Sequence, residues 1–345
     1  MIRFECDYSE GACTEILKRL AETNFCQTPG YGEDEFCARA RAYIRRECGR
    51  EDVDVHFLVG GTQANAVVIA AALRPHQGAI AAATGHINVH ESGAIEALGH
   101  KVLAVPGKGD GKLYAEDVAA VICGHFNDET HEHMVQPGLV YISFPTENGT
   151  LYTKAELTAL WEVCQKYHVY LYIDGARLGY GLASQENDLT MTDIAGLCDA
   201  FYIGGTKVGA LFGEAVILSN ESLKKDFRYI MKQRGAMLAK GRLLGLQFET
   251  LFENGLYNEI SRHAVAMAME IKAAFRKKNI PFLFESPTNQ QFPILDRRQR
   301  EILAQKYAFS FWCDVDGERS AVRFCTSWAT KEEHVRALTA DIAAL

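Results

Sequence analysis

Short apolar stretches alternate with longer segments of helical length between residues 53 and 218. The short stretches have the length of strands and fall at residues 55–59, 79–83, 101–105, 139–144, 169–173, 200–203 and 215–218. The longer segments fit helices at residues 63–73, 115–123 and 154–167. This alternation predicts an α/β layer in which helices flank a mostly parallel central sheet.

The two flanking regions have different patterns. Near the N-terminus, Ile16, Leu17 and Leu20 share one helical face, and residues 36–46 fit a second helix. Residues 221–278 read as helical. A closing helix from Lys331 follows predicted strands at 291–295, 308–312 and 321–325. A length of 345 residues favours two domains. We predict an N-terminal segment plus large α/β domain over residues 1–250, and a smaller α+β domain over residues 251–345.

Composition excludes several classes of function. Lysine plus arginine number 36 and aspartate plus glutamate 44, a net charge of −8, whereas a nucleic-acid binder shows a basic excess. The ten cysteines form no CxxC pair, which favours free thiols in a reducing cytosol over a zinc site. No signal peptide is visible, and the longest apolar stretch, residues 66–73, is far shorter than the roughly 20 residues of a membrane span. We therefore expect a cytoplasmic protein without nucleic-acid or membrane partners.

Three predicted strand ends carry residues suited to chemistry, and in open parallel sheets ligands bind beyond the carboxyl ends of strands. The first, Gly60-Gly61-Thr62, opens a helix. The free N–H groups and the dipole of a helix start favour an anion, and the Thr62 hydroxyl can donate one more bond. The alternative is an ordinary glycine turn with a threonine cap.

The other two strand ends carry charged residues. Asp174 precedes Arg177 by three residues, which fits either a ligand site or a helix cap with a simple ion pair. Lys207 follows Thr206 in a turn flanked by glycines. A desolvated lysine there would suit Schiff-base chemistry, and a flexible surface turn is the alternative.

Together these parts match the needs of pyridoxal 5′-phosphate (PLP). The cofactor requires an anion cradle, a carboxylate for its pyridinium nitrogen and a lysine for its aldehyde. His86 follows the predicted strand at 79–83, and its imidazole could stack on the ring. Alone, His86 would be interpreted as a hydrogen-bonded loop histidine.

With these parts in this order, the chain resembles the threonine aldolase and β-eliminating lyase family. That family has the fold-type I architecture of aspartate aminotransferase. The resemblance extends from about Phe4 to Arg323. It rests on Asp7-Tyr8-Ser9, Gly30-Tyr31-Gly32-Glu33-Asp34, Gly61-Thr62-Gln63-Ala64-Asn65, His86 with Glu91-Ser92-Gly93, Asp174-Gly175-Ala176-Arg177, and Thr206-Lys207.

The resemblance implies a role for each matching residue. Lys207 would bind the cofactor aldehyde, Asp174 the pyridinium nitrogen and His86 the ring face. Arg177 would lie near the phenolic oxygen of the cofactor and the carboxylate of the substrate. Arg323 would bind that carboxylate, because its guanidinium can form two parallel hydrogen bonds. The remaining implied contacts are Gly61, Thr62 and Thr206 to the phosphate, and Tyr31 and Glu91 to the substrate.

Two positions depart from the commoner family pattern. Glu147, in Pro145-Thr146-Glu147-Asn148-Gly149, stands where many aldolases of the family carry a histidine near the substrate hydroxyl. This resembles a second branch of the family, which also contains low-specificity aldolases. Cys6 stands beside Asp7 where serine or asparagine is usual, which weakens any polar substrate contact there.

The activity implied by the resemblance is retro-aldol cleavage of L-threonine or L-allo-threonine to glycine and an aldehyde. The β-hydroxyl proton would go to His86, Glu147, Glu91 or a bound water, with His86 or a water it orients preferred. The alternatives are β-elimination, transamination and a PLP-binding protein without catalysis.

Residues 224–242 contain seven lysines and arginines against the single acid Asp226. Most of this run fits a solvated helix face. The resemblance implies that Lys240 or Arg234 reaches the phosphate site of a neighbouring subunit. The expected assembly is a homodimer or homotetramer with shared active sites.

Overall fold

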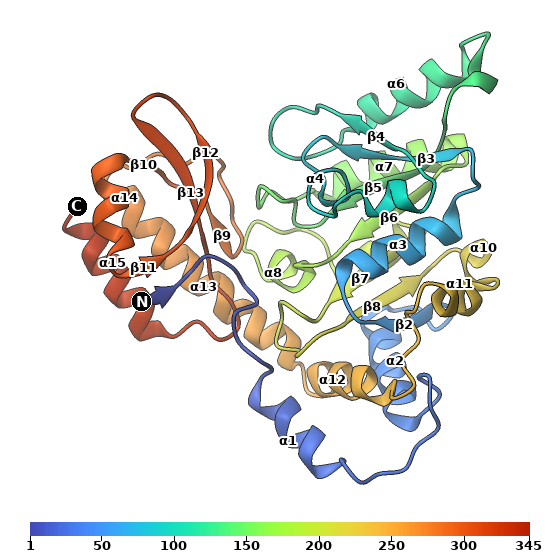
Figure 1. Cartoon of the computed structure of the whole chain (residues 1–345), viewed down its shortest axis with the longest axis horizontal. Coiled ribbons are helices and arrows are strands. Elements are labelled where there is room, and N and C mark those ends of the chain that lie inside the picture. The colour runs from blue at the N-terminus through green and yellow to red at the C-terminus, as the bar shows by residue number, and fades with distance from the viewer.

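The structure, a computed structural model, describes all residues 1–345, and a seven-stranded sheet lies at its centre (Figure 1). The strand order is β2-β8-β7-β6-β5-β3-β4, and only β8 is antiparallel to its neighbours. The predicted α/β layer with a mostly parallel sheet is confirmed. The strands are β2 (Asp54–Leu58), β3 (Gln77–Ala82), β4 (Val102–Val105), β5 (Gln136–Ser143), β6 (Tyr170–Asp174), β7 (Ala200–Gly204) and β8 (Glu214–Leu218).

Helices cover both faces of the sheet. Along β8, Val216 packs in one apolar cluster and Ile217 in the other, because successive residues of a strand point to opposite faces. The first face carries α3 (Gly61–Ala72), α4 (His86–Val89), α5 (Ala94–Ala97), α10 (Glu221–Lys224) and α11 (Phe227–Gln233). The second carries α1 (Thr14–Glu22), α2 (Glu35–Cys48), α6 (Ala115–Phe126), α7 (Lys154–Tyr167), α8 (Leu178–Leu182), α9 (Met191–Gly196) and α12 (Arg242–Glu253).

Local signals fix the ends of several of these helices. Thr153 and Glu156 form a reciprocal capping box at the start of α7, which satisfies N–H groups that have no partner inside the helix. Gly49, with φ 62°, ends α2 in the left-handed conformation that glycine adopts without strain. In contrast, no side chain caps α3, so its first N–H groups stay available to a ligand.

The C-terminal region forms a separate layer built on β13 (Arg319–Cys325). This strand pairs antiparallel with β9 (Gln290–Gln291), β10 (Ile294–Asp296) and β12 (Ser310–Asp314). The helices of this region are α13 (Leu256–Lys277), α14 (Arg297–Ala304) and α15 (Glu332–Ala343). At the other end of the chain, β1 (Ile2–Arg3) pairs with β11 (Tyr307–Ala308), and Phe4 packs in the C-terminal apolar cluster. The first residues therefore lie with the C-terminal layer, and the domain division at residue 250 stays a prediction.

Two predicted segments differ from the structure. The helical stretch 221–278 is four helices, α10 to α13, and residues 234–241 lie outside any helix. Gly235 and Gly255 have φ angles of 68° and 73°, and glycines in this conformation end helices. The predicted strand 291–295 is split into β9 and β10, since Pro293 lies between them and has no N–H to donate.

No helix of the structure is long and apolar enough to cross a membrane. The ten cysteines are all free thiols.

Candidate active site

A cavity of 320 Å³ lies at the carboxyl edge of the central sheet. This volume is within the range of small-molecule sites. The segments after β2, β3, β6 and β7 converge on it. The lining includes eight of the predicted site residues: Gly61, Thr62, His86, Glu147, Asp174, Arg177, Thr206 and Lys207.

One end of the cavity is suited to an anion. Gly60, Gly61 and Thr62 line it at the uncapped start of α3. A Cβ on Gly61 would lie 2.9 Å from the Tyr202 hydroxyl oxygen, so a larger residue there would have to displace that hydroxyl. Thr206 lines the same cavity from the segment after β7. Backbone N–H groups and hydroxyls are the donors that a phosphate requires.

Asp174 is a buried carboxylate held by four donors. The Tyr202 hydroxyl and the Ala176 N–H donate to Oδ1 over 2.5 and 3.0 Å. The Tyr141 hydroxyl and Asn65 Nδ2 donate to Oδ2 over 2.7 and 3.0 Å. Burial raises the pKa of Asp174, but the charge of His86 and these hydrogen bonds outweigh burial and lower it below its usual value. Asp174 is therefore kept ionised.

His86 is oriented by Glu91. Nδ1 of His86 lies 2.7 Å from Glu91 Oε1, and Asn65 Nδ2 donates to the same oxygen over 2.7 Å. Burial lowers the pKa of His86, whereas the hydrogen bond to Glu91 and the charge of Asp174 raise it, and the net direction is upward. Asn65 thus connects the carboxylates of Asp174 and Glu91, with His86 at the cavity wall.

Lys207 enters the cavity from the turn after β7. The Tyr180 hydroxyl donates to the Lys207 carbonyl oxygen over 2.5 Å and fixes the backbone there. Burial, and then the positive charge of Arg177, lower the pKa of Lys207. A lowered pKa gives more of the neutral amine, which is the form that attacks an aldehyde.

Arg177 is already paired, with Asp7 from the N-terminal segment. Its Nε and Nη2 donate to the two oxygens of Asp7 over 2.6 and 3.0 Å, and Asn289 Nδ2 adds a third bond over 2.9 Å. Burial raises the pKa of Asp7, but the charges of Arg177 and Lys207 together with these bonds lower it to about 2. The sequence did not predict this pair, because 170 residues separate its members.

Glu147 lies beside His86 at the cavity wall. Its Oε1 accepts from the Ser143 hydroxyl over 2.7 Å and from the His86 N–H over 2.9 Å. Burial raises the pKa of Glu147 above its usual value. At the position of the family's histidine, this chain thus has a carboxyl group of raised proton affinity that is bonded to the backbone of His86.

Four predicted site residues lie outside the lining within this chain. Glu91 is buried behind His86. Arg323 donates to the carbonyl oxygen of Glu5 over 3.1 Å, and its buried Nε has no partner. Lys240 is exposed, beyond α11. The substrate and phosphate roles of these side chains stay predictions.

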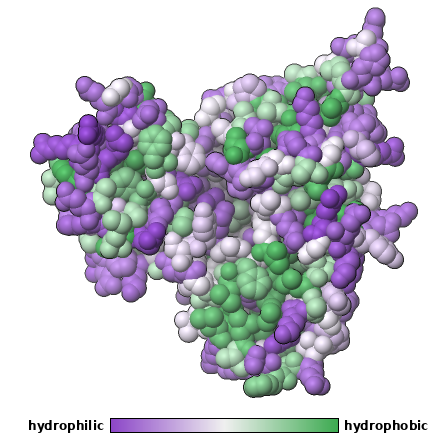
Figure 2. Space-filling view, viewed as in Figure 1, coloured by the Kyte–Doolittle hydropathy of each residue, from purple (hydrophilic) through white to green (hydrophobic).

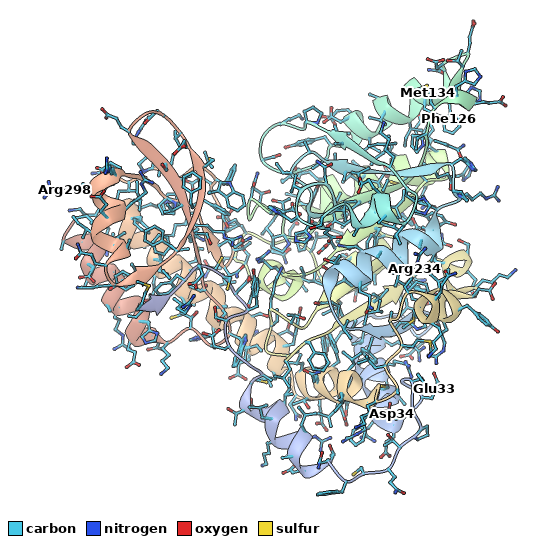
Figure 3. The ribbon with its side chains drawn as sticks, in the orientation of Figure 1. Glu33, Asp34, Phe126, Met134, Arg234 and Arg298 are labelled. Atoms are coloured by element: carbon cyan, nitrogen blue, oxygen red, sulfur yellow. The ribbon has the colours of Figure 1, made fainter.

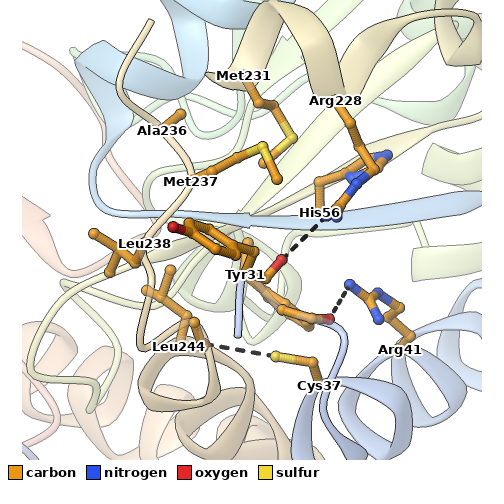
Figure 4. A pocket seen from close by; sticks show the side chains of 13 residues that line it. Tyr31, Cys37, Arg41, His56, Arg228, Met231, Ala236, Met237, Leu238 and Leu244 are labelled. Atoms are coloured by element: carbon orange, nitrogen blue, oxygen red, sulfur yellow. Dashed lines mark hydrogen bonds between the residues drawn. The ribbon is translucent and has the colours of Figure 1, made fainter. Parts of the chain in front are cut away.

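Tyr31, the fourth, lines a different and much smaller pocket of 20 Å³ (Figure 4). Arg228 donates to the Tyr31 carbonyl oxygen over 3.3 Å, and the Lys232 nitrogen lies 4.6 Å from the centre of its ring. Tyr31 is 46% exposed, so a second subunit has access to it. Its role as a substrate contact stays a prediction.

The sequence assigned no role to four cavity residues or their supports: Asn65, Tyr141, Tyr202 and Glu214. Tyr141 and Tyr202 lie inside strands, where a hydroxyl resembles any other core tyrosine until the neighbouring strand is known. Tyr202 stands on β7 beside β6, which ends at Asp174. No local pattern in the sequence marks these tyrosines, because the order of the strands comes from the packed sheet.

The side chains fit PLP at three of its polar groups. A carboxylate that stays ionised suits the pyridinium nitrogen, an amine of lowered pKa suits the aldehyde, and an uncapped helix start suits the phosphate. The fold and this cavity define a fold-type I, PLP-dependent enzyme. The chain belongs to the β-eliminating lyase family, whose model matches residues 5–297.

Known proteins support the assignment at two levels. A solved structure of Leishmania major threonine aldolase is 44% identical, with a TM-score of 0.97, and covers 100% of this chain and 99% of that one. The low-specificity L-threonine aldolase of a Pseudomonas species is 29% identical over 347 residues, which are 99% of this chain and 97% of that protein. An aspartate aminotransferase of Thermus thermophilus, 16% identical with a TM-score of 0.72 over 100% of this chain and 91% of that one, shares the fold.

Proposed function

We propose that this protein is a threonine aldolase that cleaves L-threonine or L-allo-threonine to glycine and acetaldehyde. The observation that carries the proposal is the convergence of Lys207, Asp174, His86 and the uncapped start of α3 on one cavity. The names of the relatives at 44% and 29% identity agree with this substrate class.

When bound, PLP supplies an electron sink for the electrons of the broken Cα–Cβ bond. The residues of the chain supply the rest. Asp174 stays ionised and keeps the pyridinium nitrogen protonated, because a carboxylate favours the charged form of a neighbouring base. Lys207 would hold the aldehyde, His86 would cover the ring face, and Gly61, Thr62 and Thr206 would bind the phosphate.

Substrate orientation falls to the two arginines. Arg323 lies outside the cavity lining and has a buried Nε without a partner, and the N–H groups of a guanidinium suit a carboxylate. Arg177 donates to Asp7 through Nε and Nη2, and its remaining guanidinium N–H groups are left for the ligand. Fixing the carboxylate sets the Cα–Cβ bond for cleavage.

The β-hydroxyl proton goes to His86, directly or through a water that His86 and Glu147 orient. The pKa values of both groups are raised from their usual values, and for the carboxyl group of Glu147 this is a shift toward the pH at which general bases work best. Glu91 supports His86, and Tyr31 contributes from a neighbouring subunit.

The assembly we propose is a homodimer or homotetramer in the cytoplasm, with Lys240 of one subunit at the phosphate of the next. Exposed apolar side chains support an interface: Leu17, Phe25 and Leu211 are 48%, 94% and 41% exposed. Figure 2 shows apolar surface gathered over α1 and α12. Exposed apolar patches mark association surfaces.

One assay tests the activity. Purified protein loaded with PLP is incubated with L-threonine and with L-allo-threonine, and glycine and acetaldehyde are measured. We expect both products in equal amounts, and Lys207→Ala abolishes them. Ammonia and a keto acid would instead assign β-elimination, and amino transfer to a keto acid would assign an aminotransferase. An imine absorbance without turnover would assign a non-catalytic binder.

A further inference from the structure

Glu214 is a buried carboxyl group at the anion end of the cavity. It is the first residue of β8 and pairs with Leu58, the last residue of β2, and with Gly204, the last residue of β7. Because β8 is antiparallel to both neighbours, Glu214 lies between the segments 59–62 and 205–207, which follow those strands. These segments carry the donors for the phosphate.

The side chain of Glu214 is directed into the cavity. Val216 and Leu218 of the same strand pack in the cluster that contains α3, and alternate residues share a face. Glu214 is only 4% exposed and belongs to the cavity lining. Gly205 N–H donates to its Oε2 over 3.0 Å, and no basic side chain forms a salt bridge with it.

A charged carboxylate at this position would repel the phosphate, which carries nearly two negative charges at neutral pH. Burial raises the pKa of Glu214 to about 8. The hydrogen bond with Thr206 and the positive charge of Lys207 oppose this rise, and the negative charge of Asp174 adds to it. The other titratable groups near it are Tyr172, Tyr202 and Tyr257, whose raised pKa values keep them neutral. At neutral pH the group is therefore mostly a neutral acid with a proton to donate.

We propose that Glu214 binds the cofactor phosphate as a neutral carboxylic acid that donates a hydrogen bond, so that cofactor affinity falls when this group ionises. A protein can keep a carboxylic acid neutral at pH 7 in order to use it as a donor. This inference rests on the proposed PLP site and adds a pH-dependent control of its occupancy. The sign follows from linkage: bound phosphate favours the protonated acid, so alkaline pH releases the cofactor.

The experiment measures dissociation constants of two probes, PLP and pyridoxal, which lacks the phosphate, at pH 7, 8 and 9. The proteins are the natural chain, Glu214→Gln and the control Glu221→Gln, whose side chain is exposed on α10. Glutamine donates through its amide at every pH. We expect the dissociation constant of PLP for the natural chain, divided by that for Glu214→Gln, to rise about tenfold from pH 7 to pH 9. The reason is that only the fraction of the natural chain with a protonated Glu214 is competent to bind the phosphate. For pyridoxal the same ratio stays constant.

Three results would overturn the inference or its basis. A PLP ratio that does not change with pH removes Glu214 from the phosphate site. An equal change with pyridoxal means that Glu214 acts on Lys207 instead. No binding of PLP by the folded natural chain refutes the proposed cofactor site itself. If Glu214→Gln does not fold, the ratio of PLP to pyridoxal constants of the natural chain still has to rise about tenfold over the same pH range.

Discussion

At the scale of single residues, the site works by setting protonation states. Asp174 is ionised although buried, since four donors and His86 compensate for lost solvation. His86 has a raised pKa, and the nearest reason is Glu91, whose side chain is wholly buried and bonded to Nδ1. Glu91 therefore acts as a positioning residue, which fixes the imidazole ring and its proton affinity.

We expect Glu91→Gln to lower the pKa of His86. In a plot of kcat/KM against pH, the part that rises with pH then shifts to lower pH, because His86 accepts a proton only in its neutral form. Loss of a fixed ring orientation lowers kcat by about 10- to 100-fold, as for other orienting partners of a functional histidine. The measurement is kcat/KM against pH, with the exposed Glu96→Gln as control. If the rising part of the plot does not shift, His86 is not the titrating base.

How far the sequence predicts such residues depends on where they stand. Lys207, Asp174 and Thr62 lie at or just after strand ends, and any α/β layer brings strand ends together, so the alternation of strands and helices was sufficient to group them. Tyr202 and Glu214 depend on which strands are neighbours. The order β2-β8-β7-β6 is set by packing of the whole sheet, and no local pattern carries it.

At the scale of elements, the start of α3 depends on a close approach to β7. The missing side chain of Gly61 leaves room for the Tyr202 hydroxyl, which in turn bonds to Asp174. Gly124 on α6 is exposed and lies outside the cavity lining, and an added Cβ there would meet nothing within 4 Å. The two helical glycines therefore form a matched pair for substitution.

We expect Gly61→Ala to displace Tyr202 and to weaken PLP binding by about tenfold, the equivalent of one lost hydrogen bond near a charge. Gly124→Ala should leave the dissociation constant within about twofold, because the steric change there is small and the residue is outside the cavity. Absorbance titration of each variant with PLP gives both values. Equal losses in the two variants would mean that the contact with Tyr202 does not determine binding.

Asp7 joins three segments of the chain. It accepts hydrogen bonds from Arg177, after β6, and from Asn289, which precedes β9, while itself belonging to the N-terminal segment. Because its pKa in the folded state is about 2, below the value of about 3.9 in an unfolded chain, the charged form stabilises the fold. This contribution is complete above about pH 4 and is lost as pH falls towards 2.

We expect Asp7→Asn to destabilise the protein by about 2–3 kcal/mol at pH 7. The difference from the natural chain should shrink as pH falls from about 4 to 2, where Asp7 becomes neutral. Urea unfolding of both proteins across this range measures it, with the exposed Glu10→Gln as control. A difference that is independent of pH would show that shape, and not charge, makes Asp7 important.

At the scale of the whole molecule, the basic run 224–242 separates into paired and unpaired members. Arg228 bonds to Glu33, Lys224 to Glu221 and Arg242 to Thr23. Arg234 and Lys240 are exposed (Figure 3 labels Arg234) and make no such bond within the chain. The sequence identified this run but not the pairing of Arg228 and Arg242, since their partners Glu33 and Thr23 lie far away along the chain.

Mixing two inactive variants tests whether Lys240 completes a neighbouring site. Lys207→Ala lacks the aldehyde-binding amine, and Lys240→Ala lacks the proposed phosphate contact in trans. After subunit exchange, half of the dimers are mixed, and each mixed dimer has one site with both lysines intact. Activity should therefore return to about a quarter of the natural value, because the two-fold arrangement places both substitutions in the other site. Light scattering after gel filtration establishes the assembly, and a fluorescent label on one variant confirms exchange. If exchange occurs and activity does not return, Lys240 acts within its own subunit or not at all. The apolar surface over α1 and α12 would then form an interface in which Lys240 does not complete the neighbouring active site.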